Sequence, residues 1–289
     1  MDCATAACGC MVQRMTDGKK LKNLVLALVV FTTAAWGAAG PTSAANSAFN
    51  IYIENLERRL RLQHGELRGF VAMSPEAVQR VRAGELVVEQ LRTAGGDTPG
   101  AMLHHWRGTA FVAGAAADDF ERLMREFTSY PLHYRAQVVS ARLLTHSGDH
   151  YDALLRVRQH HVLTVVMDTT YAVDFARLDA SHGYSASRST RIAEIDAAGT
   201  SHERALSADE EHGFLWKLNS YWSYAEADGG LYMQIESVSL TREIPCGLGW
   251  MVGPFVQSIP RESLEFTLGA TRNALRDAAR TRAQEGKGQ

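Results

Sequence analysis

The side chains best suited to acid–base or metal chemistry in this chain are its eleven histidines, which include the adjacent pairs His104-His105 and His160-His161. Neighbouring side chains in a strand point to opposite faces of a sheet, so neither pair can chelate one ion together. His146 and His150 flank a turn signal, where helical spacing does not apply. The histidine pattern therefore indicates no metal site.

Motifs for nucleophilic catalysis or phosphate binding are also missing from the sequence. There is no Gly-x-Ser-x-Gly elbow, and Cys246 has no evident base near it in sequence. Gly247-Leu248-Gly249 lacks the third glycine of a dinucleotide fingerprint, and Cys8-Gly9-Cys10 lacks the two-residue gap of a zinc knuckle. The sequence indicates no cofactor.

Two charged residues in predicted strands, Arg158 and Glu236, are candidates for an internal ion pair or for contact with a ligand head group. Burying an isolated charge costs too much free energy, so a buried Arg158 or Glu236 would need an opposite charge or a ligand group as its partner. The alternative is that both lie exposed on the convex face of the sheet.

Composition limits the classes of function that remain. The chain has 289 residues, of which 46% are hydrophobic and 21% are charged, values typical of a globular protein with one sizeable core. Its formal net charge of −2 provides no general attraction to a phosphate backbone, which normally requires a basic face. Nucleic acid is therefore not an expected partner.

The amino-terminal segment has the order of a secretory signal peptide. Three lysines precede an apolar run from Leu24 to Phe31, and small residues follow up to Ala45. Counted on to about Gly40, the apolar stretch reaches only about 17 residues, whereas a membrane span needs about 20. We expect cleavage near Ala44 or Ala45, which makes residues 1–45 a leader and the mature chain periplasmic or secreted. The alternative is a protein anchored in the membrane by the uncleaved segment.

Two details of the leader affect the mature protein. Met15 is a better start than Met1, because the residues before it lengthen the basic region unusually. Cleavage would leave Cys246 as the last remaining thiol, so no internal disulfide is expected.

Residues 46–83 are expected to form a helical prefix packed on the main domain. Apolar residues recur at helical spacing from Phe49 to Leu60, with arginines on the other faces. In a second short helix, Ser74 is suited to the cap and Pro75 to the first turn. The arginines indicate either a solvated face or transient contact with a membrane surface.

The main domain, residues 84–283, reads as two strands, one helix, a long series of strands and a closing helix. The first strands are 85–91 and 102–112, and a helix opens at Asp118-Asp119, where acidic residues suit the helix dipole. Alternating patterns then predict strands at 137–144, 151–159, 162–175, 185–195, 214–224 and 231–241. Short connections make neighbouring strands antiparallel. The last helix is expected from Pro260, with a polar tail at 284–289.

This order resembles the helix-grip superfamily (SRPBCC, or START-like), which includes steroidogenic-acute-regulatory-type lipid-transfer domains, birch-pollen-type allergens, and polyketide-cyclase or coenzyme-Q-binding proteins. The likeness covers about residues 84–283 and rests on soft motifs: 115–120, 234–240 and Ile244-Pro245. It implies an α+β fold in which a curved antiparallel sheet wraps around a long C-terminal helix and encloses a cavity. The superfamily shares a shape and no invariant catalytic residue, and the leader and the helical prefix are unusual in it.

The resemblance favours an exported binding or transport protein for a small hydrophobic ligand such as a lipid or a quinone. Trp250 and Phe255, with the glycines around them, would form a mobile entrance, and which strand face lines the cavity remains open. The candidate ligand-binding residues are Phe127, Arg158, Trp222, Glu236, Trp250, Phe255, Leu264 and Leu268.

Two alternatives belong to other classes of function. One is a cyclase- or hydratase-type enzyme in which Tyr221, Glu236 or a histidine performs acid–base chemistry inside the cavity. The other is an interaction module whose sheet and helix are packed solid and leave no cavity.

Overall fold

The computed structural model describes residues 40–66, 69–93, 99–160, 164–243 and 249–285, and in the last range it describes side chains from Ser258 onward. Most of the predicted leader, Cys246 and the end of the predicted polar tail lie outside these residues. So do the side chains of Trp250 and Phe255, which means that the predicted entrance stays a prediction.

One antiparallel sheet of nine strands carries the fold of the described residues. From one edge to the other its order is β1-β2-β9-β8-β6-β5-β4-β3, and β7 pairs with β6. The strands are β1 (Val87–Gln90), β2 (Ala101–Ala113), β3 (Val138–Ser147), β4 (His150–His160), β5 (Thr164–Arg177), β6 (His182–Asp196), β7 (Arg204–Ala205), β8 (Lys217–Ala227) and β9 (Gly230–Arg242).

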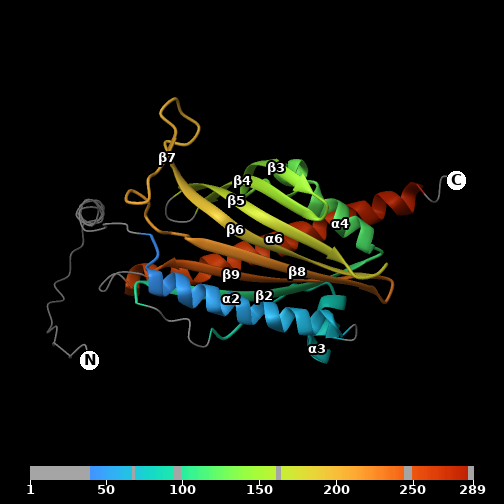
Figure 1. Ribbon diagram of the computed structural model, residues 1–289. Coiled ribbons are helices and arrows are strands. Elements are labelled where there is room, and N and C mark those ends of the chain that lie inside the picture. The colour runs from blue at the N-terminus through green and yellow to red at the C-terminus, as the bar shows by residue number, and fades with distance from the viewer. Residues whose placement is uncertain (1–39, 67–68, 94–98, 161–163, 244–248, 286–289) are drawn as a thin grey trace, which may run out of the picture. The chain divides into compact units, whose positions relative to one another are not determined.

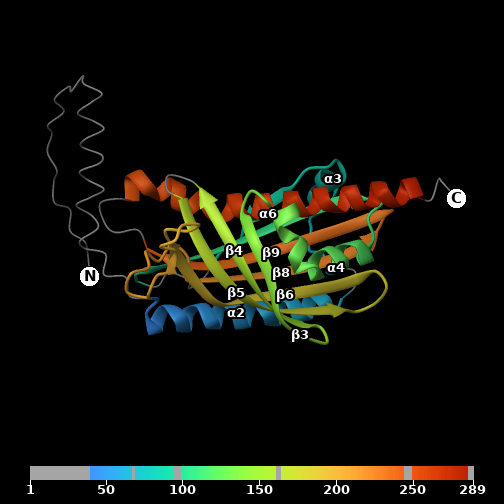
Figure 2. The ribbon, with the colours of Figure 1, turned by 90° about the horizontal axis from the view of Figure 1, so that it is seen from above.

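Two long helices cover opposite faces of this sheet, as Figures 1 and 2 show. Helix α6 (Gly249–Glu285) lies across one face, and α2 (Ser43–His64) lies across the other. The shorter helices are α3 (Pro75–Arg82), α4 (Ala117–Arg125), η2 (Phe127–Ser129) and α5 (Tyr130–His133). We call the α6 side the inner face of the sheet and the α2 side the outer face.

The inner face contains the main core. On α6, Leu264 and Leu268 pack against the sheet where β2 has Gly108. A Cβ atom at Gly108 would lie 2.6 Å from the Leu264 side chain and 3.0 Å from that of Leu268. The glycine therefore provides the space that lets α6 lie close to β2.

The outer face has a second core, formed by α2. Thr42 caps this helix by accepting a hydrogen bond from the Ala45 amide at 3.1 Å. Apolar residues at spacings of three and four, from Ala45 to Leu60, then pack on Ala101, Leu103 and Val238 of the sheet. The prefix is thus a structural layer of the domain, as its periodicity predicts.

The predicted fold class is confirmed: the described strands form an antiparallel sheet against a long C-terminal helix, and helices precede it in the chain. The hairpin between β8 and β9 turns at Asp228-Gly229, both with positive φ, as the turn signal predicts. Helix α3 also starts as predicted, with the Ser74 hydroxyl accepting from the Ala77 amide at 3.2 Å.

Several boundaries differ from those predicted, and the start of the last helix differs most. The last helix begins at Gly249, eleven residues before Pro260, and continues through that proline. A proline inside a helix costs about 3 kcal/mol, a penalty that tertiary packing can offset. The strand predicted from Phe214 begins at Lys217, and β7 was not predicted, because a two-residue strand carries no alternation.

Candidate functional site

The pairing of strands decides which side chains point inward. On β8, Leu218 and Trp222 belong to the inner core, whereas Tyr221 belongs to the outer one. On β9, Ile235 points inward and Val238 outward. This answers the question of facing that the sequence left open.

A cavity of about 190 Å³ lies between the inner face of the sheet, the helices α4, η2 and α5, and the N-terminal half of α6. Most of its lining is apolar or aromatic. These side chains are Met124, Phe127, Tyr130, Tyr134, Val138, Leu155, Val157, Met167, Tyr171, Val173, Phe175, Leu215, Leu218, Trp222, Ile235 and Phe266.

The remaining lining side chains are polar but uncharged: Gln137, Gln159, Thr169, Ser185, Ser187, Ser220, Ser263 and Thr267. Ser187 and Ser220 are directly opposite each other on β6 and β8. Among the described residues, neither hydroxyl has a hydrogen-bond partner, so both can bond to a bound molecule.

The tyrosines of the lining are neutral hydrogen-bonding groups. The Tyr134 hydroxyl is 2.8 Å from that of Thr271, and the Tyr130 hydroxyl donates to the Met124 carbonyl at 2.7 Å. Burial raises the pKa of Tyr134 to about 12 and also raises the pKa values of Tyr130 and Tyr171. All three therefore stay protonated at neutral pH.

The described lining includes no aspartate, glutamate, histidine, lysine or arginine. A charged ligand group would lose its hydration in such a cavity without gaining an opposite charge. The cavity thus suits a neutral molecule whose polar atoms accept or donate hydrogen bonds.

The structure separates the eight candidate residues. Phe127 and Trp222 line the cavity. Leu264 and Leu268 lie in the contact between α6 and the sheet, while Ser263, Phe266 and Thr267 on the same helix line the cavity. Trp250 and Phe255 belong to α6, but their side chains are outside the described set.

The structure does not bring Arg158 and Glu236 together. Arg158 is exposed on β4, whereas Glu236 is 1% exposed on the outer face of β9. Since side chains alternate along a strand, Glu236 points away from Ile235 and therefore away from the cavity. Neither charge is a head-group contact inside it.

Glu236 instead lies at the centre of an ion-pair network between β9, β2 and α2. Its carboxylate contacts Arg59 of α2, the His105 Nε2 atom at 2.9 Å and the Arg107 Nε atom at 3.1 Å. Tyr52 of α2 completes the network, with its hydroxyl 2.7 Å from the His105 Nδ1 atom.

This network keeps Glu236 ionised. Burial alone would raise the pKa of Glu236, but the hydrogen bond with His105 and the charges of Arg107 and Arg59 outweigh burial and lower this pKa to about 2. Arg59, one of the arginines expected on a solvated or membrane-facing surface, is thus a partner of a buried carboxylate.

Another histidine of the outer face is buried. His64, at the end of α2, lies 2.8 Å from the Ser223 hydroxyl and stacks between Phe70 and Tyr184. Burial lowers the pKa of His64 to about 4, so the ring is neutral at physiological pH.

Two further observations concern the described residues as a whole. They contain no group of three or more His, Cys, Asp or Glu side chains placed to hold a metal ion. None of their helices combines the length and apolarity that crossing a bilayer requires.

Sequence reasoning missed most of the cavity. Every second residue of β5 from Met167 to Phe175 lines the cavity, and the sequence predicts a strand there. The alternation could have identified Met167, Thr169, Tyr171, Val173 and Phe175 as one face. It could not have shown that this face, and not the other, encloses the cavity.

Comparisons by sequence found no match. No protein-family model matches the chain. No curated protein matches it. The order of the strands and the C-terminal helix on the inner face are those of a helix grip. The fold is a helix grip. The fold that the resemblance implies is thus confirmed.

Solved structures with a similar backbone include the STAR-related lipid transfer protein from Xanthomonas axonopodis, at 17% identity and a TM-score of 0.40 over 65% of this chain and 98% of that one. The Zhui aromatase/cyclase from a Streptomyces species is 14% identical, with a TM-score of 0.43 over 63% and 96%. A START superfamily protein from Mycobacterium smegmatis is 13% identical, with a TM-score of 0.40 over 60% and 98%. At these values we take nothing about ligand or chemistry from the likeness.

Proposed function

We propose that this protein binds a small, uncharged and largely apolar molecule in the cavity between the sheet and α6. The observation that carries the proposal is the described lining, which combines apolar and aromatic side chains with hydroxyl and amide groups and has no charged side chain. Binding sites for small molecules commonly have this composition.

The volume of the cavity limits the size of the ligand. A hydrophobic cavity of about 150 Å³ suffices for benzene, whereas sites for drug-sized molecules have about 300–1,000 Å³. At about 190 Å³, this cavity has room for one ring, for two fused rings or for the end of a longer molecule. A quinone ring or a short lipid chain meets both the size and the charge requirement.

A binding role agrees better with this lining than acid–base catalysis does. Tyr221 and Glu236 were the candidate catalytic groups, and both lie on the outer face, in contact with side chains of α2. No histidine belongs to the described lining. The similar solved structures have names of both kinds, lipid transfer and aromatase/cyclase, so the choice rests on the lining of this chain.

Three probes of similar size test the proposal. 1,4-Naphthoquinone and 1-naphthol are neutral, and 1-naphthoate carries a carboxylate. We expect the two neutral probes to bind and to quench Trp222, because this ring lines the cavity. The Trp222→Phe variant should retain binding, measured by calorimetry, and lose most of the quenching.

A pair of variants locates the binding. Ser187→Leu places a larger side chain in the cavity and should weaken binding of 1,4-naphthoquinone at least about tenfold, whereas Ser201→Leu makes the same change at an exposed loop position and should leave it unchanged. The proposal would be contradicted if the two variants bound 1,4-naphthoquinone with equal affinity. It would also be contradicted if 1-naphthoate bound more tightly than 1-naphthol, and if Ser187→Leu abolished that binding. Solvent extraction and mass spectrometry of the purified protein would then identify the natural ligand.

We also propose that the protein acts after export. The support is the order of basic, apolar and small residues between Lys19 and Ala45. Helix α2 begins at Ser43 and uses Thr42 as its cap, so cleavage before Thr42 would preserve the helix, whereas cleavage after Ala45 would remove its first turn. N-terminal sequencing of protein from the periplasm or the medium tests this. Recovery of the protein from the cytoplasm with its leader intact would contradict it. Transient contact with a membrane stays a prediction.

A further inference from the structure

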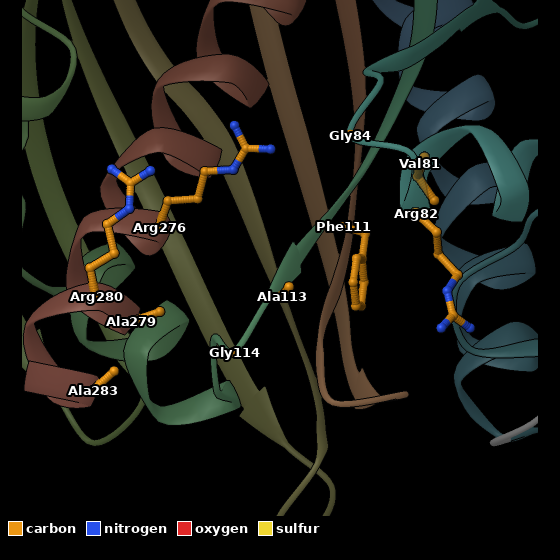
Figure 3. A pocket seen from close by; sticks show the side chains of 10 residues that line it. All are labelled: Val81, Arg82, Gly84, Phe111, Ala113, Gly114, Arg276, Ala279, Arg280 and Ala283. Atoms are coloured by element: carbon orange, nitrogen blue, oxygen red, sulfur yellow. The ribbon is translucent and has the colours of Figure 1, made fainter. Parts of the chain in front are cut away.

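A second hollow, separate from the cavity, lies on the outside of the domain where α3, the end of β2 and the C-terminal half of α6 meet (Figure 3). Its volume is about 420 Å³, within the range of sites for small molecules. It shares no lining residue with the cavity. We call it the arginine groove, and its lining residues are Val81, Arg82, Gly84, Phe111, Ala113, Gly114, Arg276, Ala279, Arg280 and Ala283.

Arginines stand on two walls of the groove. Figure 3 shows Arg276 and Arg280 on successive turns of α6, with Arg82 on the facing α3 side. Arg82 pairs with Asp228 at 3.0 Å, and Arg280 lies 3.6 Å from Asp277, both in exposed positions where such pairs are weak. Arg276 has no carboxylate within ion-pair distance among the described residues.

The positive charge extends one turn further along α6. Arg272 donates to the Gly84 carbonyl at 2.8 Å, and its Nε atom is buried without a partner in the described residues. Burial and the nearby charge of Arg276 lower the pKa of Arg272. Three arginines spaced four residues apart repel one another, which is notable in a chain whose formal net charge is −2.

The floor between these walls is apolar. It runs around the end of β2: Ala279 and Ala283 of α6 lie on one side of this strand, and Phe111 lies on the other side, beside Val81 and Arg82. The guanidinium carbon of Arg82 lies 6.0 Å from the centre of the Phe111 ring. This apolar floor, next to Arg276 and the weakly paired Arg280, is complementary to a molecule that has an anionic head and an apolar tail.

We propose that the arginine groove binds an amphiphilic anion, with its phosphate or carboxylate group on Arg276 and Arg280 and its apolar part on Phe111 and Ala279. The site differs in chemistry from the cavity, which has no cation in its described lining. One protein would then hold a neutral molecule inside and an anionic amphiphile outside. The proposal does not depend on what the cavity binds.

Calorimetry on the full-length Ser187→Leu variant with octyl phosphate, octanol and inorganic phosphate tests the groove. This variant is used because its larger side chain obstructs the cavity, where octanol could otherwise bind. We expect octyl phosphate to bind at least about tenfold more tightly than either of the others, because only it has both the head and the tail. Its affinity should fall as salt concentration rises. Equal binding of inorganic phosphate would overturn the role of the apolar floor, and equal binding of octanol would overturn the role of the arginines.

Matched variants locate the site. Arg276→Gln should weaken octyl phosphate binding about tenfold. Arg261→Gln changes an exposed arginine of the same helix that pairs with Glu265, and should have no effect. Removing one of several like charges should leave the melting temperature of Arg276→Gln at or above that of the wild type. If Arg276→Gln fails to fold, Ala279→Leu is tested in its place. The larger side chain fills part of the apolar floor and should weaken octyl phosphate binding about tenfold. Unchanged affinity in the variant tested would overturn the proposal.

Discussion

The two faces of the sheet differ in the charge of their polar side chains and in how fully these side chains are hydrogen-bonded. The outer face buries Glu236 and His105 and supplies them with partners from α2 and β2. The inner face, around the cavity, has hydroxyl and amide groups without charge, and the Ser187 and Ser220 hydroxyls have no partner among the described residues.

This difference indicates where the domain can accept a ligand. A buried charge is tolerated only where opposite charges and hydrogen bonds surround it. The outer face meets this requirement with side chains of its own chain, which leaves little for a ligand to contribute. The inner face leaves hydrogen-bonding capacity and volume free, so a neutral guest can enter without displacing an ion pair.

The largest effect is expected from breaking the outer network. Glu236→Ala leaves Arg59, Arg107 and His105 without their carboxylate, and we expect the free energy of unfolding to fall by about 3 kcal/mol. Urea denaturation measures this, with Glu85→Ala as control, because Glu85 pairs with Arg80 at an exposed site and should cost less than about 1 kcal/mol. A loss as small as that of the control would mean that the network does not hold α2 on the sheet.

A smaller effect is expected where α6 meets the inner face. Gly108→Val brings a side chain against Leu264 and Leu268, and overpacking of this kind costs about 1–3 kcal/mol. It should also weaken binding of 1,4-naphthoquinone, since α6 supplies part of the cavity wall. Gly69→Val is the control, because no atom lies within 4 Å of a Cβ added there. Wild-type stability of Gly108→Val would show that α6 is not held closely by this glycine.

The third test concerns the pH dependence of the outer face. The folded pKa of His64, about 4, is below its ordinary value of 6.5, so the unfolded chain binds more protons between these values. Stability should therefore decline as pH falls from 6.5 towards 4. In His64→Phe, which keeps the stacking with Phe70 and Tyr184, this part of the decline should disappear.

Melting temperatures measured from pH 4 to 7 test this, and an identical slope in the variant would contradict it. Glu236 acts in a different window. Its folded pKa of about 2 lies below the ordinary 4.5, so its contribution is present above pH 4.5 and is lost as pH falls towards 2. Extending the measurements down to pH 2 therefore tells the two groups apart.

Much of the fold could be predicted because its signals are local. Ser74 and Pro75 start a helix, and Asp228-Gly229 turns a hairpin, through interactions within a few residues. The start of α6 could not be predicted in this way. Pro260 is a local signal for a boundary, and the packing of the whole helix on the sheet overrides it.

The candidate site was predicted less completely. Phe127 and Trp222 were candidates because large aromatic residues in a predicted core helix and strand tend to reach its interior, and both line the cavity. The face of Glu236 stayed open, because alternation divides a strand into two sets of residues and does not say which set faces which layer. Its true partner Arg59 is far away in the chain and belongs to a helix that seemed peripheral.

The sequence by itself determined the order of helices and strands, the antiparallel pairing of neighbours and the amphipathic character of α2 and α6, because each depends on residue spacing over a few turns or strand positions. The tertiary structure alone decided which face of each strand meets α6 and which meets α2. It also brought Arg82 of α3 into one groove with Arg276 of α6. The reason is physical: facing and long-range proximity are set by how the layers pack together, and no local pattern encodes the partner on the other side.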